Sequence, residues 1–277
     1  MPIPRRIIQT GKSRTLSPLA RASATNLKLL HPDWEYIYFD DADVGRFIDT
    51  EFPEHREAFD AFPQNIQRFD FFRYLAIFRL GGFYFDTDVL LYEPLDELLS
   101  GTAVFPFEEI TLNAHLRRAG IDWEIGNYAF GAAQSEPFLG RVIENCVRSL
   151  HDTSWASEML HGIPGAFRAG FEVLCTTGPA MLSRTLVENS KFAQNVTVLF
   201  PPDVCDPTHW HQFGRYGTHL MEGTWRVKGG FLRRRLGWLW ADRLQRQLLA
   251  DSRLRGPVRA VPQSQQPRAV IAGDARG

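Results

Sequence analysis

The most constraining feature of this sequence is the stretch 67–96, in which an apolar segment stops at two glycines and resumes just before two aspartates. Apolar residues recur at steps of three and four over 68–80, which predicts a buried helix. Gly81 and Gly82 favour the end of that helix, because glycine adopts positive φ readily. The aromatic run 83–85 then predicts a short interior strand.

The two aspartates after that strand, Asp86 and Asp88, are separated by one residue. Alternate residues of an extended chain point to the same side, so both carboxylates can converge on one ion. Burying two carboxylates is costly unless a positive charge lies between them, and hard divalent cations take oxygen ligands. We therefore expect a metal site, with a turn that carries a solvated acidic pair as the alternative.

Strand and helix patterns alternate through the first third of the 277-residue chain. Strands are predicted at 3–9 and 34–39, with a helix at 16–30 between them. This alternation is typical of a βαβ-type parallel sheet flanked by helices. Ligands of such sheets collect at the carboxyl ends of the strands, which is where Asp86 and Asp88 fall.

The segments 70–74 (DFFRY) and 81–89 (GGFYFDTDV) resemble the core of glycosyltransferases with a DXD sugar-binding motif. These include the alpha-mannosyltransferase-like enzymes of yeast outer-chain initiation and bacterial relatives that make capsule, lipopolysaccharide and other polysaccharides, and the large clostridial glucosylating toxins have a similar core. The family form is roughly S-D-x-x-R-Y, an apolar stretch and G-G-x-Y-x-D-x-D, and Phe69 stands here where the family often has serine.

This resemblance implies a GT-A-type α/β domain with a mostly parallel sheet flanked by helices. The implied activity is transfer of a sugar from a nucleotide-diphosphate sugar to a glycan or glycolipid acceptor, with retention and an alpha-linked product. Asp86 and Asp88 are the implied catalytic residues, which hold Mn²⁺ or Mg²⁺ against the leaving diphosphate, with His219 as a third ligand. The implied donor-binding residues are Gln9, Thr10, Asp70, Arg73, Asn127, Gly178, Gly223, Thr224 and Trp225.

Alternatives accompany several of these residues. Asp70 and Arg73 lie three apart on one helix face, which is also the spacing of a surface ion pair. Asn127, in a strand expected at 126–132, has the alternative of a satisfied turn asparagine. His209 and His211 compete with His219 as imidazole ligands for Mn²⁺, but only His219 is followed by the G-T-W that resembles the family's closing motif. No nucleophile or base is identified, although carboxylates remain available at Glu108, Asp122 and Glu124.

The C-terminal part differs in charge from the rest. Residues 226–259 carry ten Lys or Arg and two Asp, a net charge of about +8, whereas the whole chain is −1. We expect a catalytic domain at 1–228, a basic amphipathic helix at 229–255 and a disordered tail at 256–277. With Trp238 and Trp240, that helix suits an anionic membrane surface. The alternative is a helix that packs back on the domain.

Composition excludes several classes of protein. Apolar residues at 44% and charged residues at 23% are ordinary for a globular protein. Three cysteines are too few for a disulfide framework, no apolar run reaches the ~18–20 residues that span a bilayer, and the start lacks the apolar core of a signal peptide. We expect a cytoplasmic protein, peripheral on the inner face of the membrane. A nucleic-acid partner is not expected, because no such motif occurs.

Two other functions fit part of the pattern. A haloacid-dehalogenase-type phosphatase also places D-x-D after an apolar strand, with Asp86 as nucleophile and Asp88 as acid/base. That site needs a downstream lysine followed by an acidic pair, and Lys191 has no such pair. A non-catalytic sugar-binding module is the other alternative, and it does not explain the buried charge.

Overall fold

The computed structural model describes residues 1–221, 231–251 and 259–260. Three residues of the predicted donor site, Gly223, Thr224 and Trp225, lie outside the described residues, as does 261–277 of the predicted tail.

A central sheet of eight strands organises the described residues, in the order β11-β8-β5-β7-β3-β1-β2 with β6 paired to β5. The strands are β1 (Arg6–Thr10), β2 (Glu35–Phe39), β3 (Gly82–Phe85), β5 (Ala103–Ile110), β6 (Trp123–Ile125), β7 (Ala129–Ala132), β8 (Val196–Leu199) and β11 (Arg259–Ala260). Neighbours are parallel except at β6, which runs antiparallel to β5, and at β7, which runs antiparallel to both β3 and β5. The predicted α/β class is confirmed, whereas the reversal at β7 was not predicted.

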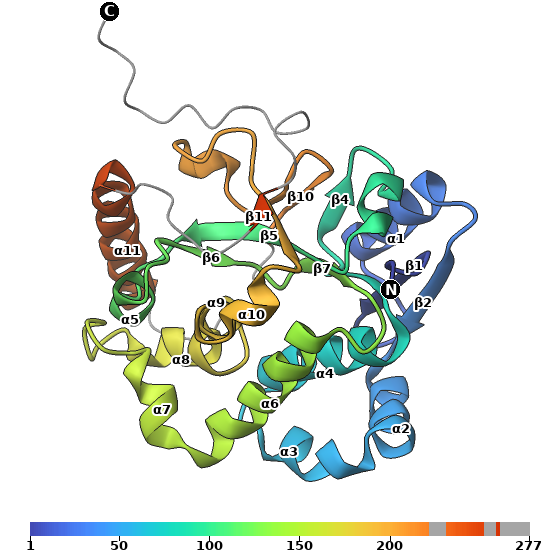
Figure 1. Cartoon of the computed structure of the whole chain (residues 1–277), viewed down its shortest axis with the longest axis horizontal. Coiled ribbons are helices and arrows are strands. Elements are labelled where there is room, and N and C mark those ends of the chain that lie inside the picture. Colours follow the sequence, from blue (N-terminus) through green and yellow to red (C-terminus); the bar gives the residue numbers. More distant parts are fainter. Residues whose placement is uncertain (222–230, 252–258, 261–277) are drawn as a thin grey trace, which may run out of the picture.

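Helices cover both faces of this sheet, as Figure 1 shows. One face carries α2 (Asp41–Glu51), α3 (Arg56–Ala61), α4 (Asn65–Leu80), α6 (Pro137–His151), α7 (Thr153–Glu158), α8 (Arg168–Thr176), α9 (Pro179–Glu188) and α10 (Ser190–Ala193). The other face carries α1 (Pro18–Leu30) and a small sheet in the order β4-β10-β9, made of β4 (Val89–Leu91), β10 (Gly217–His219) and β9 (Gln212–Phe213). Near the β5–β6 end lie α5 (Ala114–Arg118) and α11 (Phe231–Asp251).

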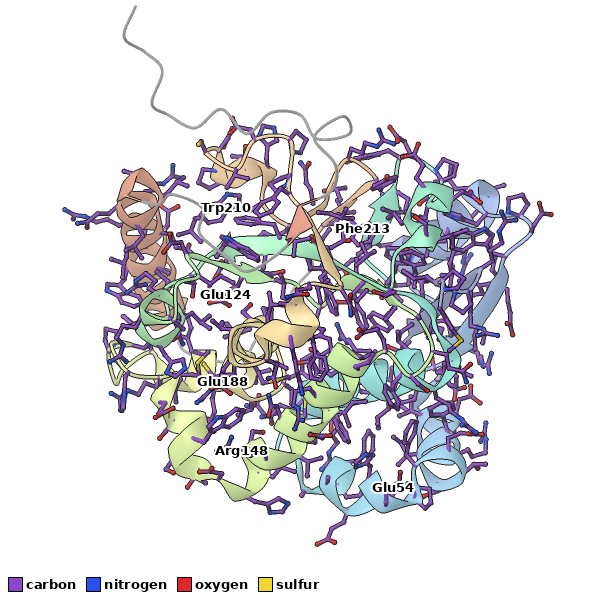
Figure 2. All side chains as sticks on the ribbon, viewed as in Figure 1. Glu54, Glu124, Arg148, Glu188, Trp210 and Phe213 are labelled. Carbon is purple, nitrogen blue, oxygen red and sulfur yellow. The ribbon has the colours of Figure 1, made fainter. Side chains whose placement is uncertain are left out.

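Alternation along the strands divides the core between the two faces. Tyr84 is buried in the cluster beneath the helices, whereas its neighbours Phe83 and Phe85 are buried in the cluster under α1 and the small sheet. Phe213 of β9, labelled in Figure 2, meets those two rings edge-on with centroids 6.4 and 5.5 Å away. The small sheet is thereby fixed on the main one, and β3 is the buried interior strand that the sequence predicts.

The two glycines after α4 each have a structural reason. Gly81, at φ 66°, ends the helix and donates its N–H to the carbonyl of Ile77 at 2.8 Å. Gly82, at φ 110°, lies so close to β1 that an added Cβ would be 2.6 Å from the carbonyl oxygen of Arg6. Glycine alone tolerates both conditions, and the turn leads directly into the strand that ends at Asp86.

Two observations bear on the expectations for the C-terminal part. Arg259 and Ala260, in the tail predicted to be disordered, pair parallel with β8. The ring of Trp240, which we expected at a membrane surface, lies 5.6 and 6.4 Å from the rings of Phe167 and Phe171, a contact that the alternative of a helix packed on the domain predicts. None of the helices in the described ranges is long and apolar enough to cross a bilayer.

Candidate metal centre

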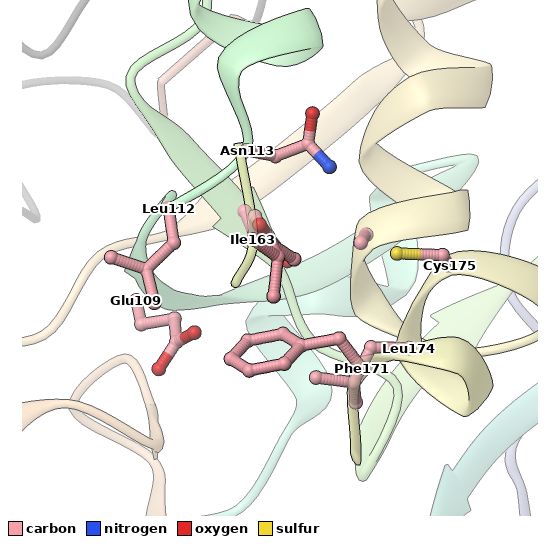
Figure 3. Close-up of a pocket in the computed structure, with 9 residues that line it drawn as sticks. Glu109, Leu112, Asn113, Ile163, Phe171, Leu174 and Cys175 are labelled. Carbon is pink, nitrogen blue, oxygen red and sulfur yellow. The ribbon is translucent and has the colours of Figure 1, made fainter. Parts of the chain in front are cut away.

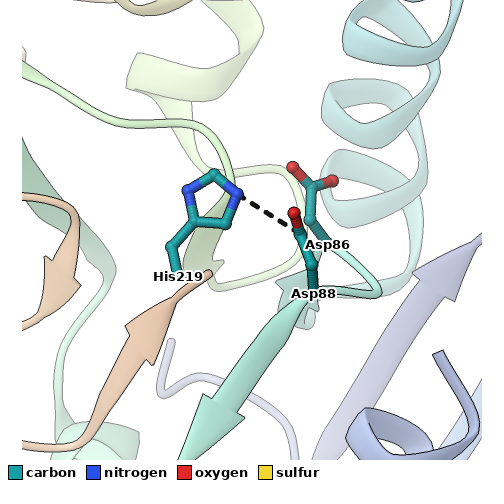
Figure 4. Close-up of side chains that lie close together, drawn as sticks. All are labelled: Asp86, Asp88 and His219. Carbon is teal, nitrogen blue, oxygen red and sulfur yellow. Dashed lines mark ion pairs between the residues drawn. The ribbon is translucent and has the colours of Figure 1, made fainter. Parts of the chain in front are cut away.

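Three potential ligands converge where the main sheet meets the small one. Asp86 follows β3, Asp88 precedes β4, and His219 ends β10, which pairs antiparallel with β4 so that His219 lies opposite Val89. One ligand atom from each residue lies within 4.8 Å of the others, and His219 Nε2 is 3.2 Å from an Asp88 carboxylate oxygen (Figure 4). Their side chains are 27%, 14% and 16% exposed, so all three can be reached from solvent.

Backbone and buried polar groups hold the turn that carries the two aspartates. The N–H of Asp86 donates to the carbonyl of Tyr128 at 2.7 Å, and its own carbonyl accepts from the N–H of Val89 at 3.1 Å. Gln9 donates its side-chain amide to that same carbonyl at 3.2 Å. The turn is therefore fixed from β1, β4 and the loop before β7.

These residues fit a divalent metal ion. Two carboxylates and an imidazole form the oxygen and nitrogen donor set that suits Mn²⁺, and Mg²⁺ also binds such carboxylates. The Nδ1 atom of His219 is buried and has no hydrogen-bond partner among the residues that the structure describes. The ring is instead held by Tyr128, which stacks on it at 4.4 Å and 16°. The stack fixes the ring with Nε2 turned toward Asp88, where that nitrogen and the carboxylate can bind one ion together.

Arg73 of α4 lies behind the triad and neutralises it. Its side chain is 5% exposed, and its guanidinium is 3.2 Å from carboxylate oxygens of both Asp86 and Asp70. It also donates to the carbonyl of Asn127 at 2.8 Å and lies over the ring of Tyr84 at 4.6 Å. Asp70 and Arg73 are thus a buried pair, and the alternative of a surface ion pair is wrong.

Asp70 is enclosed by protein donors. It accepts from Asn127 Nδ2 and from the Thr177 hydroxyl, both at 3.0 Å, and is 4% exposed. Burial raises the pKa of Asp70 to about 7, and Arg73 opposes that rise. Asn127 lies in the loop before β7 and also donates to the Tyr74 hydroxyl at 3.0 Å, so its side chain belongs to this network.

The predicted contact between Gln9 and the donor is not supported by the geometry. Gln9 is completely buried, donates to the hydroxyl of Ser23 at 3.1 Å and accepts from the hydroxyl of Tyr36 at 2.8 Å. A buried glutamine with these hydrogen bonds is suited to support the turn at Asp86. Thr10, the next residue, is partly exposed and its hydroxyl lies 3.0 Å from that of Tyr84.

Gly178 has a packing role rather than an evident ligand contact. It is the N-cap of α9, and an added Cβ would be 2.9 Å from the Cα of Leu174 on α8. The residue before it, Thr177, is the one that reaches Asp70.

Sequence reasoning missed three residues of the site: Tyr84, Tyr128 and Thr177. The Tyr84 hydroxyl donates to Asp86 at 2.8 Å, and its position two residues before Asp86 was a usable signal, because alternate strand residues share a face. Of the competing histidines, His209 lies 3.7 Å from Asp206, and His211 pairs with Glu108 at 3.3 Å. The ranking of His219 above them agrees with the convergence of the three ligands.

The other available carboxylates are not part of the triad. Glu124, which accepts from the Thr111 hydroxyl, lines a cavity of about 10 Å³ with Glu109, Phe171 and Cys175 (Figure 3). A cavity of that volume holds about one water molecule. Burial raises the pKa of Glu124 to about 8. Asp122 is buried, at 6% exposure.

The sequence of this chain is similar to those of known proteins. Residues 20–105 match the family model "Glycosyltransferase sugar-binding region containing DXD motif". The chain is 34% identical to inositol phosphoceramide mannosyltransferase 3 of Schizosaccharomyces pombe over 53% of this chain and 38% of that protein. It is 33% identical to the initiation-specific alpha-1,6-mannosyltransferase of Saccharomyces cerevisiae over 34% of this chain and 22% of that protein. The chain thus spans less than half the length of these relatives.

Among solved structures, the chain is similar to the PaToxG glycosyltransferase, with a TM-score of 0.47 and 14% identity over 68% of this chain and 70% of that one. The resemblance to DXD glycosyltransferases and to yeast mannosyltransferases is therefore confirmed by sequence. Asp86, Thr87 and Asp88 lie within the matched segment and have its D-x-D pattern. Residues 20–105 of this chain are thus similar to the glycosyltransferase sugar-binding region that contains the DXD motif.

Proposed function

We propose that this protein is a metal-dependent glycosyltransferase that moves a sugar from a nucleotide-diphosphate sugar to a hydroxyl of a glycan or glycolipid. The observation that carries the proposal is the convergence of Asp86, Asp88 and His219 within a DXD sugar-binding region. Cleavage of the donor builds negative charge on the leaving diphosphate. Mn²⁺ or Mg²⁺, when bound to these residues, supplies a Lewis acid for that charge.

The buried residues behind the triad organise it. Arg73 holds the Asp86 carboxylate against Tyr84, which fixes the direction in which its oxygens point. Asp70 is held in turn by hydrogen bonds from the side-chain amide of Asn127 and from the hydroxyl of Thr177. We therefore assign Arg73 and Asp70 a positioning role, in place of the direct donor contacts that the resemblance implies. Preorganised groups of this kind lose no energy to reorganisation during the reaction.

The names of the relatives narrow the substrates to be tested. The S. pombe relative is named for mannosyl transfer to inositol phosphoceramide, so mannose as the transferred sugar and an inositol-containing lipid as the acceptor come first. Retention and an alpha linkage remain part of the proposal, supported by the family resemblance. A role in capsule or lipopolysaccharide synthesis is the corresponding proposal for a bacterial acceptor.

The phosphatase alternative is less well supported. A phosphatase would use Asp86 as a nucleophile, but that carboxylate pairs with Arg73 and accepts from Tyr84, which suits a group that holds an ion. Lys191, the lysine considered for that chemistry, lies over the ring of Phe192 at 4.7 Å on α10. A membrane contact through 229–255 is also less well supported, because Trp240 packs on the domain.

Turnover of nucleotide sugars tests the proposal. GDP-mannose, UDP-glucose and UDP-galactose are each incubated with the protein and Mn²⁺ or Mg²⁺, and release of the nucleoside diphosphate is measured. We expect release with at least one donor, loss on adding EDTA, and loss in Asp88→Asn. Asp96→Asn is the matched control, because Asp96 makes an exposed pair with Arg5. Absence of release with every donor, or release of inorganic phosphate from a phosphomonoester, would contradict the proposal.

A further inference from the structure

A second polar cluster lies beside His219, and we call its residues Glu108, Tyr128 and His211 the Glu108 cluster. The ring of Tyr128 stacks on His219, and the ring of His211 meets His219 edge-on at 6.4 Å. Glu108, on β5, lies 3.3 Å from His211 Nδ1 through one carboxylate oxygen. Three segments far apart in the sequence thus bring these groups to one flank of the triad.

Within the Glu108 cluster, Glu108 Oε2 and the Tyr128 hydroxyl are buried and have no hydrogen-bond partner in the described ranges. Tyr128 is 3% exposed, and burial together with the charge of Glu108 raises its pKa. Folded proteins seldom leave a buried carboxylate oxygen and a buried hydroxyl unpaired, because both lose their bonds to water. These two buried atoms beside the metal centre therefore lack, among the described residues, a partner that a ligand hydroxyl can supply.

The backbone is shaped to admit these side chains. A Cβ on Gly126 would lie 2.2 Å from Glu108 Oε2 and 2.8 Å from the ring of Tyr128, so glycine is required where both pass over the chain. His211 has φ 60°, a strained value for a residue with a side chain. Strain of this kind persists where the surroundings hold it, and it gathers at functional sites.

The Glu108 cluster and the buried network around Arg73 contact different members of the triad. Asp86 pairs with Arg73, which also pairs with Asp70. Asp88 instead pairs with His219, whose ring contacts the Glu108 cluster. The adjacent residues Asn127 and Tyr128 contact different groups, because Asn127 donates a hydrogen bond to Asp70 whereas Tyr128 stacks on His219. The Glu108 and His211 side chains are 16% and 18% exposed, close to the 16% of His219, so a ligand can reach them.

We propose that the Glu108 cluster binds adjacent hydroxyl groups of the acceptor and so determines which acceptor is used. A carboxylate oxygen accepts from one hydroxyl of a sugar or inositol ring, and the Tyr128 hydroxyl bonds to the next. The inference rests on the proposed transferase function. It adds the chemical class that the Glu108 cluster recognises, a polyol with neighbouring hydroxyls.

The test separates the acceptor from the donor. Binding of myo-inositol and of methyl α-D-mannopyranoside to the full chain with Mg²⁺, which is diamagnetic, is measured by saturation-transfer NMR, and donor KM is measured from hydrolysis of the nucleotide sugar. Glu108→Gln and Tyr128→Phe are each expected to weaken polyol binding about tenfold or more, and the donor KM of Glu108→Gln should stay within about twofold of wild type. Glu109→Gln, the next residue on β5, which lines the separate small cavity, is the matched control and should change neither.

Three results would overturn this inference. They are no saturation transfer from the wild-type protein to either polyol, polyol binding unchanged in both variants, and a donor KM of Glu108→Gln raised well beyond twofold, which would place donor hydroxyls in the cluster. Tyr128→Phe removes one oxygen from a buried ring, so it keeps the test valid if Glu108→Gln fails to fold. Failure of the transferase proposal itself is a distinct result, the absence of donor hydrolysis in wild type.

Discussion

Replacing Arg73 with methionine should destabilise the fold strongly, because it removes the positive charge between the buried carboxylate of Asp70 and the partly exposed carboxylate of Asp86. The side chains of Arg73 and Asp70 are each 5% exposed, so water cannot readily replace the lost partner. Breaking a buried ion pair from one side costs ~3–5 kcal/mol. Each kcal/mol lowers the melting temperature of a chain of this size by ~2–4 °C, so we expect a decrease of ~6–20 °C.

The loss should also depend on pH, through Asp70. Burial raises the pKa of Asp70 to about 7 in the folded protein although Arg73 lowers it, so without Arg73 that pKa rises further. The unfolded chain has an aspartate pKa of about 3.9, and the folded variant therefore holds a proton that the unfolded chain releases. Such a group stabilises the fold fully below about pH 4 and loses that effect as pH rises through the folded pKa. The deficit of the variant is expected to be larger at pH 8 than at pH 5.

Guanidinium unfolding followed by circular dichroism at pH 5 and pH 8 measures both effects. Arg56→Met is the matched control, because Arg56 pairs with Asp49 and Asp60 while 41% exposed and should cost no more than ~1 kcal/mol. Equal losses in the two variants, or a larger deficit for Arg73→Met at pH 5, would refute the reasoning.

Two further predictions concern residues away from the triad. Glu136 caps α6 through a bond from the Leu139 N–H, and burial raises its pKa to about 7, so its contribution to stability is present below about pH 4.5 and is lost as pH rises through 7. Glu136→Gln should flatten the pH dependence of the unfolding free energy between pH 5 and 8, and an unchanged slope in denaturant titrations would contradict this. Trp240→Ala should lower the unfolding free energy by ~1–3 kcal/mol by removing contacts with Phe167 and Phe171. Unchanged stability with lost sedimentation on anionic vesicles would instead support the membrane alternative.

Local patterns predicted the elements around the motif well. The period of apolar residues and the two glycines gave α4 and its end, and the aromatic run gave β3, because these features depend on neighbours in sequence. The D-x-D spacing likewise placed Asp86 and Asp88 together. His219 was reached only through a family resemblance, since its position depends on the antiparallel pairing of β10 with β4.

Other contacts depend on long-range packing, which the local sequence does not show. Gln9 was assigned to the donor from its place at a strand end, but Ser23 and Tyr36 enclose it, and neither contact is visible in the local sequence. The burial of Arg73 likewise depends on residues far along the chain, among them Asn127. Trp240 fits a membrane helix by composition, and only the placement of α8 shows what it contacts.

Titration with Mn²⁺ followed by electron paramagnetic resonance tests the central claim most directly, because it needs no donor or acceptor. The wild-type chain should bind a single Mn²⁺, and Asp88→Asn and His219→Ala should each weaken that binding about tenfold or more. His209→Ala, whose imidazole lies 3.7 Å from Asp206 rather than at the triad, should bind Mn²⁺ as wild type does. Equal affinity in all four proteins would contradict a metal centre formed by Asp86, Asp88 and His219.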